Sequence, residues 1–203
     1  AHAEQSGSAP GDIRYKDLDN NGVINANDQT TIGSPFPNFT YGFNVNLLYK
    51  GFDLAIALNG KQGHQLYNLI WSDLNEGEGD NNATTEMLNR WSPSNPNTNI
   101  PRAVTGNPGQ NTRPSTRFIE NGSFLRIQNV QLGYAFNDAI KRWKGSLRVY
   151  VAATNLVTFT NYRGYNPEIG LLTEGNRSSL TRGIDFGMYP IPRTFEAGVQ
   201  LGF

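Results

Sequence analysis

The chain has 203 residues, and its 17 Lys and Arg residues balance its 17 Asp and Glu residues, so its formal net charge is zero. Binding to nucleic-acid phosphates requires an excess of basic side chains, and we therefore expect no nucleic-acid partner. The absence of cysteine excludes a disulfide framework and a thiolate metal site. No apolar run reaches the roughly 20 residues that a membrane helix needs, and the first residues contain no signal-peptide core. We therefore expect that only strands of this chain could cross a bilayer.

Residues 1–37 are predicted to form an irregular region that contains a calcium-type acidic loop. Oxygen-bearing residues occupy loop positions one, three, five, nine and twelve, with glycine at position six and an aliphatic residue at position eight. This is an EF-hand-type spacing, and Ca²⁺ prefers six to eight oxygen ligands. In the alternative interpretation, the segment is an Asx-rich turn closed by its own side chains without a metal. The expected ligands of a structural Ca²⁺ are Asp17, Asp19, Asn21, the Val23 carbonyl, Asn25 and Asp28.

The next two runs predict a β-hairpin over residues 38–49 and 52–60. In both runs, aromatic and aliphatic side chains alternate with polar or small ones. A period of two indicates strands that present one apolar face. The connection Lys50-Gly51 is short enough for a tight hairpin turn.

Three further strands are predicted at about 123–136, 146–155 and 193–203. In the first of these, the apolar residues change parity partway along the run. One added residue reverses the side-chain phase of a strand, so a β-bulge near Gln128 or Asn129 would return all of its apolar residues to one face.

Two long connections are predicted. The first, about 61–122, separates the hairpin from the next two strands, and the second, about 156–192, separates these from the last strand. Apolar residues at helical spacing predict short helices over His64–Leu74 and from Thr84 or Thr85 to Trp91, and we expect their apolar side chains to pack the connection. The connections also carry aromatic residues mixed with Asn, Arg and Gly. Such surfaces suit a sugar, a peptide or a protein partner, because they combine stacking with hydrogen bonds. The candidate contact residues are Tyr67, Trp71, Trp91, Tyr162 and Tyr165.

These elements together predict an all-β, antiparallel segment of a transmembrane β-barrel. Short turns are expected at one end of the strands and long loops at the other, as in bacterial outer-membrane barrels. Alternation alone fits a soluble β-sandwich with inward apolar faces equally well. Since about eight strands are the practical minimum for such a barrel, five strands would form one part of a larger wall. We expect the chain to be the carboxyl-terminal part of a longer protein.

No catalytic site is expected. His2 and His64 are the histidines of the chain, and they are far apart in the sequence without an acidic partner at a suggestive spacing. A Ser-His-Asp or His-metal mechanism therefore has no support from the residues, and we expect the protein not to be an enzyme.

Several sequence blocks resemble one family. They include Gly-Asp-Ile-Arg-Tyr-Lys-Asp (11–17), Ile-Gly-Ser-Pro-Phe-Pro-Asn-Phe-Thr-Tyr-Gly-Phe (32–43), Ser-Phe-Leu-Arg-Ile-Gln-Asn-Val-Gln-Leu-Gly-Tyr (123–134) and Tyr-Pro-Ile-Pro-Arg-Thr-Phe (189–195). In this order, and over nearly the whole chain, they resemble the carboxyl-terminal portion of SusC/RagA-type TonB-dependent transporters of the Bacteroidetes outer membrane.

The resemblance implies a 22-stranded barrel with an amino-terminal plug, which imports oligosaccharides or peptides across the outer membrane of a Gram-negative bacterium. It also implies a SusD-like surface lipoprotein over the extracellular mouth, and energy from TonB-ExbB-ExbD acting on parts outside this chain. The chain would supply the last five strands, in contact with outer-membrane lipid and with the rest of the barrel. Residues 1–37 and the two long connections would be extracellular loops, and Phe203 would end the signal for barrel assembly.

The alternative function is a secreted, calcium-stabilised β-sandwich that acts as an adhesin or a carbohydrate-binding module. The two interpretations place the same side chains differently. In the barrel, apolar residues such as Phe43 and Val199 would face lipid, and polar residues such as Asn44 and Gln200 would face the lumen. In the sandwich, the apolar residues would be buried between two sheets.

Overall fold

The computed structural model of the protein describes residues 3–75, 77, 82–136, 145–169 and 181–202. The chain divides into two compact units. The first, called here the strand unit, comprises residues 34–66, 120–183 and 188–203. The second, called the loop unit, comprises residues 1–33, 67–119 and 184–187.

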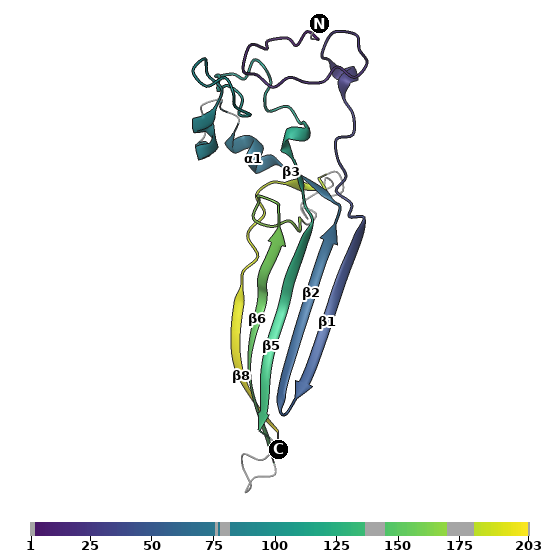
Figure 1. Ribbon diagram of the computed structural model, residues 1–203, viewed down its shortest axis with the longest axis vertical. Helices are drawn as coiled ribbons and strands as arrows, with labels where there is room; N and C mark the ends of the chain where they lie inside the picture. Colours follow the sequence, from purple (N-terminus) through teal and green to yellow (C-terminus); the bar gives the residue numbers. More distant parts are fainter. Residues whose placement is uncertain (1–2, 76, 78–81, 137–144, 170–180, 203) are drawn as a thin grey trace. The chain divides into compact units, whose positions relative to one another are not determined.

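The strand unit is built on a five-stranded antiparallel sheet with the order β1-β2-β5-β6-β8 (Figure 1). Each of these strands pairs with the next long strand in the sequence, so the sheet is a meander. This arrangement confirms the predicted antiparallel all-β fold. The strands are β1 (Phe39–Tyr49), β2 (Phe52–Gln62), β5 (Phe124–Phe136), β6 (Ser146–Thr160) and β8 (Thr194–Gly202).

The first hairpin turns in two residues. Lys50 and Gly51 have φ angles of 46° and 86°, and positive φ at both central positions is what a type I′ turn requires. The register then runs without a break from Tyr49 opposite Phe52 to the far end of the hairpin. Because this pairing continues, β2 extends to Gln62 rather than ending at residue 60.

A β-bulge interrupts β5 at the expected place. Ile127 pairs with Leu58 and Asn129 pairs with Ala57, so Gln128 is left as the extra residue. An added residue changes the side-chain phase of the rest of the strand. The bulge therefore returns the apolar residues on both sides of Gln128 to one face of the sheet.

Strand β6 is longer than the sequence pattern predicts. It runs to Thr160 rather than ending near residue 155. Thr154 and Val157 pair with residues on either side of the bulge in β5, and Asn155 lies between them with a φ of 53°. Because the alternation of apolar and polar residues changes at Asn155, the sequence pattern predicts an end of the strand where the strand in fact continues.

The sheet has two chemically different faces. On one of them, called here the apolar face, neighbouring side chains are mainly aliphatic or aromatic, as where Val45 pairs with Ile56. On the other, called the polar face, Asn46, Gln131 and Glu196 lie in one row across the strands. Alternation with a period of two assigns each residue to one of these faces.

The apolar face is exposed. Its most exposed large side chains range from 37% exposed at Val149 to 71% exposed at Phe195, and others, such as Ile56, are half-buried. Soluble proteins rarely expose a contiguous apolar surface of this extent, and such a surface marks contact with a membrane or a partner. A sandwich would bury these side chains, so the sandwich alternative has no support. The exposed large side chains of the apolar face are Phe39, Phe43, Val45, Leu47, Tyr49, Phe52, Leu132, Val149, Val151, Phe159, Phe195, Val199 and Leu201.

The loop unit contains little regular structure. Strand β7 (Ile184–Asp185) pairs in parallel with the end of β3 (Gln65–Asn68), which leads into helix α1 (Leu69–Leu74). No helix among the described residues has the length and apolar character to cross a membrane. The other short elements of the loop unit are 3₁₀ helices over Ala26–Asp28, Thr85–Asn89 and Thr116–Phe118, whereas strand β4 (Ile119–Asn121) lies mainly in the strand unit.

The first predicted helix begins later than expected. Residues 65–68 form β3, and the helix starts after Asn68, whose side chain accepts a hydrogen bond from Trp71 N as a cap. The second predicted helix is a 3₁₀ helix that follows Thr84. The Thr84 hydroxyl contacts Asn75 Oδ1 rather than the helix backbone. Tertiary contacts therefore outweigh helical spacing at residues 65–68, which form a strand. They also outweigh the expected capping role of Thr84.

Candidate functional site

The acidic loop of the loop unit brings its carboxylates together. Asp17, Asp19 and Asp28 each place a carboxylate oxygen within 4.8 Å of the other two. The backbone shapes this cluster, because Gly22 N donates to Asp17 Oδ2 at 2.9 Å and Leu18 N donates to Asp28 Oδ1 at 2.7 Å. The structure thus assembles three of the predicted ligands at one point.

The remaining predicted ligands take part in hydrogen bonds within the loop. Asn21 Oδ1 accepts from Val23 N at 2.8 Å, and Asn25 Nδ2 donates to the Val23 carbonyl at 3.3 Å. Such bonds are those of an Asx-rich turn. However, Asp17 Oδ1 is buried and has no hydrogen-bond partner among the described residues. A buried carboxylate oxygen without a partner is costly, and a cation among the three carboxylates would compensate it.

Asp28 closes the acidic loop on its own backbone. Asn25 N donates to Asp28 Oδ2 at 2.8 Å, and Asn25 Oδ1 accepts from Asn27 N at 2.8 Å, so the two side chains cap the 3₁₀ helix reciprocally. The backbone hydrogen bonds from Asn25 and Leu18 lower the pKa of Asp28 below its ordinary value. This carboxylate is therefore ionised at neutral pH, as a ligand of a cation must be.

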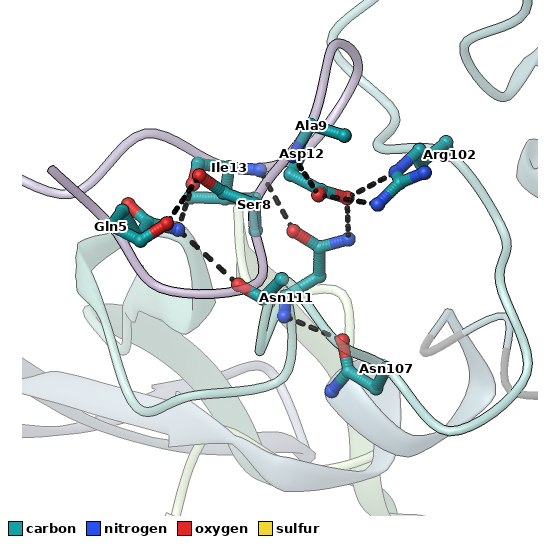
Figure 2. Close-up of polar contacts among 9 residues, drawn as sticks. Gln5, Ser8, Ala9, Asp12, Ile13, Arg102, Asn107 and Asn111 are labelled. Carbon is teal, nitrogen blue, oxygen red and sulfur yellow. Dashed lines mark hydrogen bonds and ion pairs between the residues drawn. The ribbon is translucent and has the colours of Figure 1, made fainter.

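A second polar cluster ties the start of the chain to residues 102–111 of the same unit, as Figure 2 shows. Asp12 accepts hydrogen bonds from Arg102 Nε at 2.7 Å and from Arg102 Nη2 at 2.8 Å. Asn111 joins the pair, because its Nδ2 donates to Asp12 Oδ1 at 3.0 Å and its Oδ1 accepts from Ile13 N at 2.8 Å. Gln5 adds a contact through Nε2 to the Ile13 carbonyl at 3.0 Å.

Asp12 is the centre of this cluster, and its side chain is only 3% exposed. Burial acts to raise the pKa of Asp12, but hydrogen bonds from Arg102, Asn111 and Ala9 N outweigh burial and lower the pKa. The carboxylate is therefore charged at neutral pH and links the segment around Ala9 and Asp12 to Arg102 and Asn111.

A pocket of about 520 Å³ lies beside the acidic loop, within the loop unit. Ligand pockets commonly measure roughly 300–1,000 Å³, so a small ligand would fit. Leu18, Asn25 and Asp28 belong both to the acidic loop and to the pocket wall. The other lining residues are Tyr15, Lys16, Ile24, Gln29, Thr30, Ile32, Arg113, Pro114, Ser115 and Thr116.

Tyr15 is fixed in the pocket wall by its neighbours. Its hydroxyl donates to the Gln110 carbonyl at 2.6 Å, and the Arg113 guanidinium lies over its ring, 5.3 Å from the centroid. Burial raises the pKa of Tyr15 to about 12, although Arg113 acts in the opposite direction. The phenol therefore stays protonated and keeps its hydrogen bond, and Arg113 covers one face of the ring.

Two of the predicted contact residues belong to an aromatic cluster of the loop unit. The Trp71 ring centroid lies 5.6 Å from that of Phe118, the Arg117 guanidinium lies 5.2 Å above the Trp71 ring, and Trp71 Nε1 donates to Glu86 Oε2. Tyr67 packs against Phe118 from another side, with centroids 5.9 Å apart. Both residues thus pack the loop unit.

The other predicted contact residues differ in exposure. The ring of Trp91 packs against Gly11, where an added Cβ would collide with it. Tyr162 is buried, whereas Tyr165 is 73% exposed. Phe203, the predicted assembly signal, lies outside the described residues. A role of these residues in binding cargo or a partner stays a prediction.

A charged cluster on the polar face of the strand unit was not predicted from the sequence. Arg126 of β5 is 5% exposed and donates to Thr158 Oγ1, Asn166 Oδ1 and Glu168 Oε2. Lys61 bonds the other Glu168 oxygen at 2.8 Å. Burial acts to raise the pKa of Glu168, but these two cations lower it. A charged residue inside an alternating strand was the available signal, but Asn166 and Glu168 come from a connection with no periodicity.

A second missed cluster crosses the polar face near the hairpin turn. Arg148 of β6 donates to Asp53 of β2 and to Gln200 of β8, at 2.8 Å and 3.0 Å. The Arg148 side chain passes over Gly133 of the intervening β5, where an added Cβ would meet both charged groups. Side-chain hydrogen bonds from Arg148 therefore link strands β2, β6 and β8 across the polar face. The bond to Asp53 requires a glycine at position 133, because a larger residue would occupy the same space.

These features define a class of protein. A meander of long antiparallel strands, apolar and exposed on one face and polar on the other, is the wall of a β-barrel that crosses a membrane.

Comparison with known proteins identifies the family. The chain is 38% identical to TonB-dependent receptor P3 of Formosa agariphila, over 97% of this chain and 19% of that protein. It is 30% identical to TonB-dependent receptor SusC of Bacteroides thetaiotaomicron, over 93% of this chain and 17% of that protein. The structure of the RagAB peptide importer in the closed-closed state matches 100% of this chain and 22% of that chain, with 29% identity and a TM-score of 0.74. No protein-family model matches the sequence.

The chain belongs to the SusC/RagA type of TonB-dependent receptors, as the sequence blocks indicated. It spans about a fifth of the length of the curated relatives it matches, 19% and 17% of the two named. The described sheet is therefore a segment of a larger β-barrel fold.

Proposed function

We propose that the full-length protein is a TonB-dependent importer in the outer membrane of a Gram-negative bacterium, and that this chain forms part of its barrel wall. The observation that carries the proposal is the sheet with an exposed apolar face and a polar opposite face. Lipid would cover the apolar face, and the polar face would line the lumen. The proposal is supported by relatives that are named TonB-dependent receptors and by a structural neighbour described as a peptide importer.

The strands at the two ends of the sheet support the need for further strands. In the strand order, β1 and β8 each pair on one side only among the described residues. Long unpaired edges favour pairing with other strands, and closure into a barrel removes them. We propose that the rest of the same protein supplies these strands, and that the present strands are the last five of the barrel.

The family suggests a class of cargo and a set of partners. We propose that the protein imports oligosaccharides or peptides, that a SusD-like lipoprotein covers the extracellular mouth, and that TonB-ExbB-ExbD supplies the energy through parts of the protein outside this chain. We propose that Tyr165, which is 73% exposed, contacts the cargo or the lipoprotein.

Uptake in living cells tests this function. A strain that lacks the full-length gene should lose growth on the cognate peptide or oligosaccharide, and the wild-type gene should restore it. Deletion of TonB or treatment with a proton uncoupler should abolish the same uptake. Uptake that continues without TonB would contradict active import, and recovery of the full-length protein in the soluble fraction would contradict the membrane location.

We further propose that the acidic loop binds a structural Ca²⁺. Support comes from the three converging carboxylates, from the unpartnered Asp17 Oδ1, and from the oxygen-rich spacing of the loop. Asp17, Asp19 and Asp28 would supply charged oxygens, and Asn21, Asn25 and the Val23 carbonyl would complete the ligands after releasing their bonds within the loop. The ion would brace this part of the loop unit.

Calorimetry of the chelator-treated full-length receptor tests the Ca²⁺ site. Extracellular Ca²⁺ modules bind with dissociation constants of about 10⁻⁴ to 10⁻³ M, and we expect a value in this range. Asp19→Asn should weaken binding at least tenfold, because one charged ligand is lost, whereas Asp73→Asn in α1 should not change it. Absence of a Ca²⁺ heat in the wild-type receptor would reject the metal and leave the Asx-rich turn as the correct interpretation.

A further inference from the structure

The pocket beside the acidic loop has apolar walls. Leu18 and Ile24 line it from the acidic loop, Ile32 from the segment that follows, and Pro114 from the segment of residues 113–116. Aliphatic surfaces of this kind favour an apolar group of the ligand, because its burial removes apolar area from water. The pocket therefore suits a ligand with an aliphatic part.

The same pocket offers little to a sugar ring. Protein sites for sugars commonly use an aromatic face for stacking. Tyr15 is the aromatic residue among those that line the pocket, and the Arg113 guanidinium already lies over its ring. The Tyr15 hydroxyl is also engaged, since it donates to the Gln110 carbonyl.

Polar groups with unused capacity lie beside the apolar walls. Ser115 Oγ is buried and has no hydrogen-bond partner among the described residues, although Ser115 stands at the N-cap position of a 3₁₀ helix. A buried hydroxyl of this kind calls for a ligand or water partner. Lys16 and Arg113 add positive charge to the wall, and Arg113 keeps further N–H donors beside the bond from its Nη2 to Gln110 Oε1. Both oxygens of Asp28 accept bonds from backbone N–H groups of the acidic loop.

We propose that this pocket binds a short peptide in which an aliphatic side chain lies next to a carboxylate, such as a carboxyl-terminal leucine. The aliphatic side chain contacts Leu18, Ile24 and Ile32. The carboxylate takes the charge of Arg113 and the hydroxyl of Ser115. This assignment rests on the proposed import function and names peptide, rather than oligosaccharide, as the class of cargo that the loop unit recognises.

Calorimetric titration of the full-length, Ca²⁺-saturated receptor in detergent tests the pocket. The probes are Gly-Gly-Leu with a free carboxylate, its carboxyl-terminal amide, Gly-Gly-Gly and maltotriose. We expect the amide and Gly-Gly-Gly to bind about tenfold more weakly than Gly-Gly-Leu, the change that corresponds to one charge-assisted bond or one buried aliphatic group. Maltotriose should not compete.

Ser115→Ala is the decisive variant. Because Ser115 Oγ bonds no described group in the free protein, its removal should leave the unfolding temperature unchanged while it weakens Gly-Gly-Leu binding about three- to tenfold. Arg113→Gln should weaken binding about tenfold. The matched controls are Ser94→Ala and Arg90→Gln, which lie in the same unit away from the lining residues and should bind as the wild type does.

Two results would overturn the proposal. Equal peptide affinity of Ser115→Ala and Ser94→Ala would show that the pocket does not hold the peptide. Binding of maltotriose that Ser115→Ala weakens would assign the pocket to a sugar. Either result is compatible with TonB-dependent uptake by the wild-type strain. If the proposed import function is wrong, that strain will show no TonB-dependent uptake of any cargo.

Discussion

At the scale of single residues, glycine decides which charged groups meet on the polar face. Arg148 reaches Asp53 because Gly133 lies between them without a side chain. The sequence shows these residues only as isolated charges and a glycine in three separate strands. Their meeting depends on the register of β2, β5 and β6, which the sequence pattern does not specify.

Gly133→Ala is expected to lower the unfolding temperature of the full-length barrel. The new Cβ would enter the space of the Arg148 and Asp53 side chains and would separate them. Gly42→Ala is the control, because a Cβ at Gly42 on the same face would meet only Leu58 O at 3.5 Å, an ordinary contact. Heat-modified migration on gels measures both variants. Equal unfolding temperatures would show that the Arg148–Asp53 contact adds nothing.

The stability of the loop unit is expected to depend on pH through Asp12. Its pKa in the folded protein is lowered, so its contribution to stability is full above the unfolded pKa of about 3.9 and is lost as the pH falls through the folded pKa. We expect the Ala9 amide, which donates to Asp12 Oδ2 at 2.8 Å, to lose hydrogen-exchange protection below about pH 4.

Asp12→Asn tests the same contact without acid. It should cost this segment about 1 to 3 kcal/mol of local stability at neutral pH, because Arg102 and Asn111 lose a charged acceptor. Protection of the Ala9 amide should then be low at all pH values. Unchanged protection in the variant would show that other contacts hold the segment.

At the scale of elements, the sequence predicts strands well where alternation is unbroken and poorly where it is not. The β1–β2 hairpin follows from its period and its two-residue turn, and the bulge at Gln128 follows from one change of parity. The end of β6 was misplaced because Asn155 breaks the alternation inside a strand that continues. The start of α1 was misplaced because β3 has the apolar spacing of a helix.

The strand β8 provides a direct test of which face meets lipid. Val199 lies on the apolar face and is exposed. Val199→Arg should destabilise the barrel by up to about 2 to 4 kcal/mol, the cost of an Arg at the bilayer midplane, because the charge would enter hydrocarbon. Glu196→Arg on the polar face of the same strand should cost much less. Urea unfolding of the full-length receptor in lipid vesicles measures both, and equal costs would contradict the assignment of faces.

At the scale of the whole molecule, the fold class and the family could be predicted from the sequence, whereas much of the candidate site could not. The alternating strands predicted the sheet, and the sequence blocks predicted the relatives. The acidic loop was visible because its converging carboxylates, Asp17, Asp19 and Asp28, are neighbours in the sequence. The pocket was not, because Ser115 and Arg113 reach it from a distant, aperiodic segment.

The assignment of the sheet as a barrel wall is tested most directly by measuring what surrounds its apolar face in the native membrane. Spin labels on single cysteines at residues 43–47 of the full-length receptor, with any other cysteines replaced, would report contact with oxygen dissolved in lipid and with a water-soluble nickel chelate. We predict alternation with a period of two, in which labels at Phe43, Val45 and Leu47 contact lipid and labels at Asn44 and Asn46 do not. Labels at Phe43, Val45 and Leu47 that reach neither reagent, as between two packed sheets, would contradict the barrel wall.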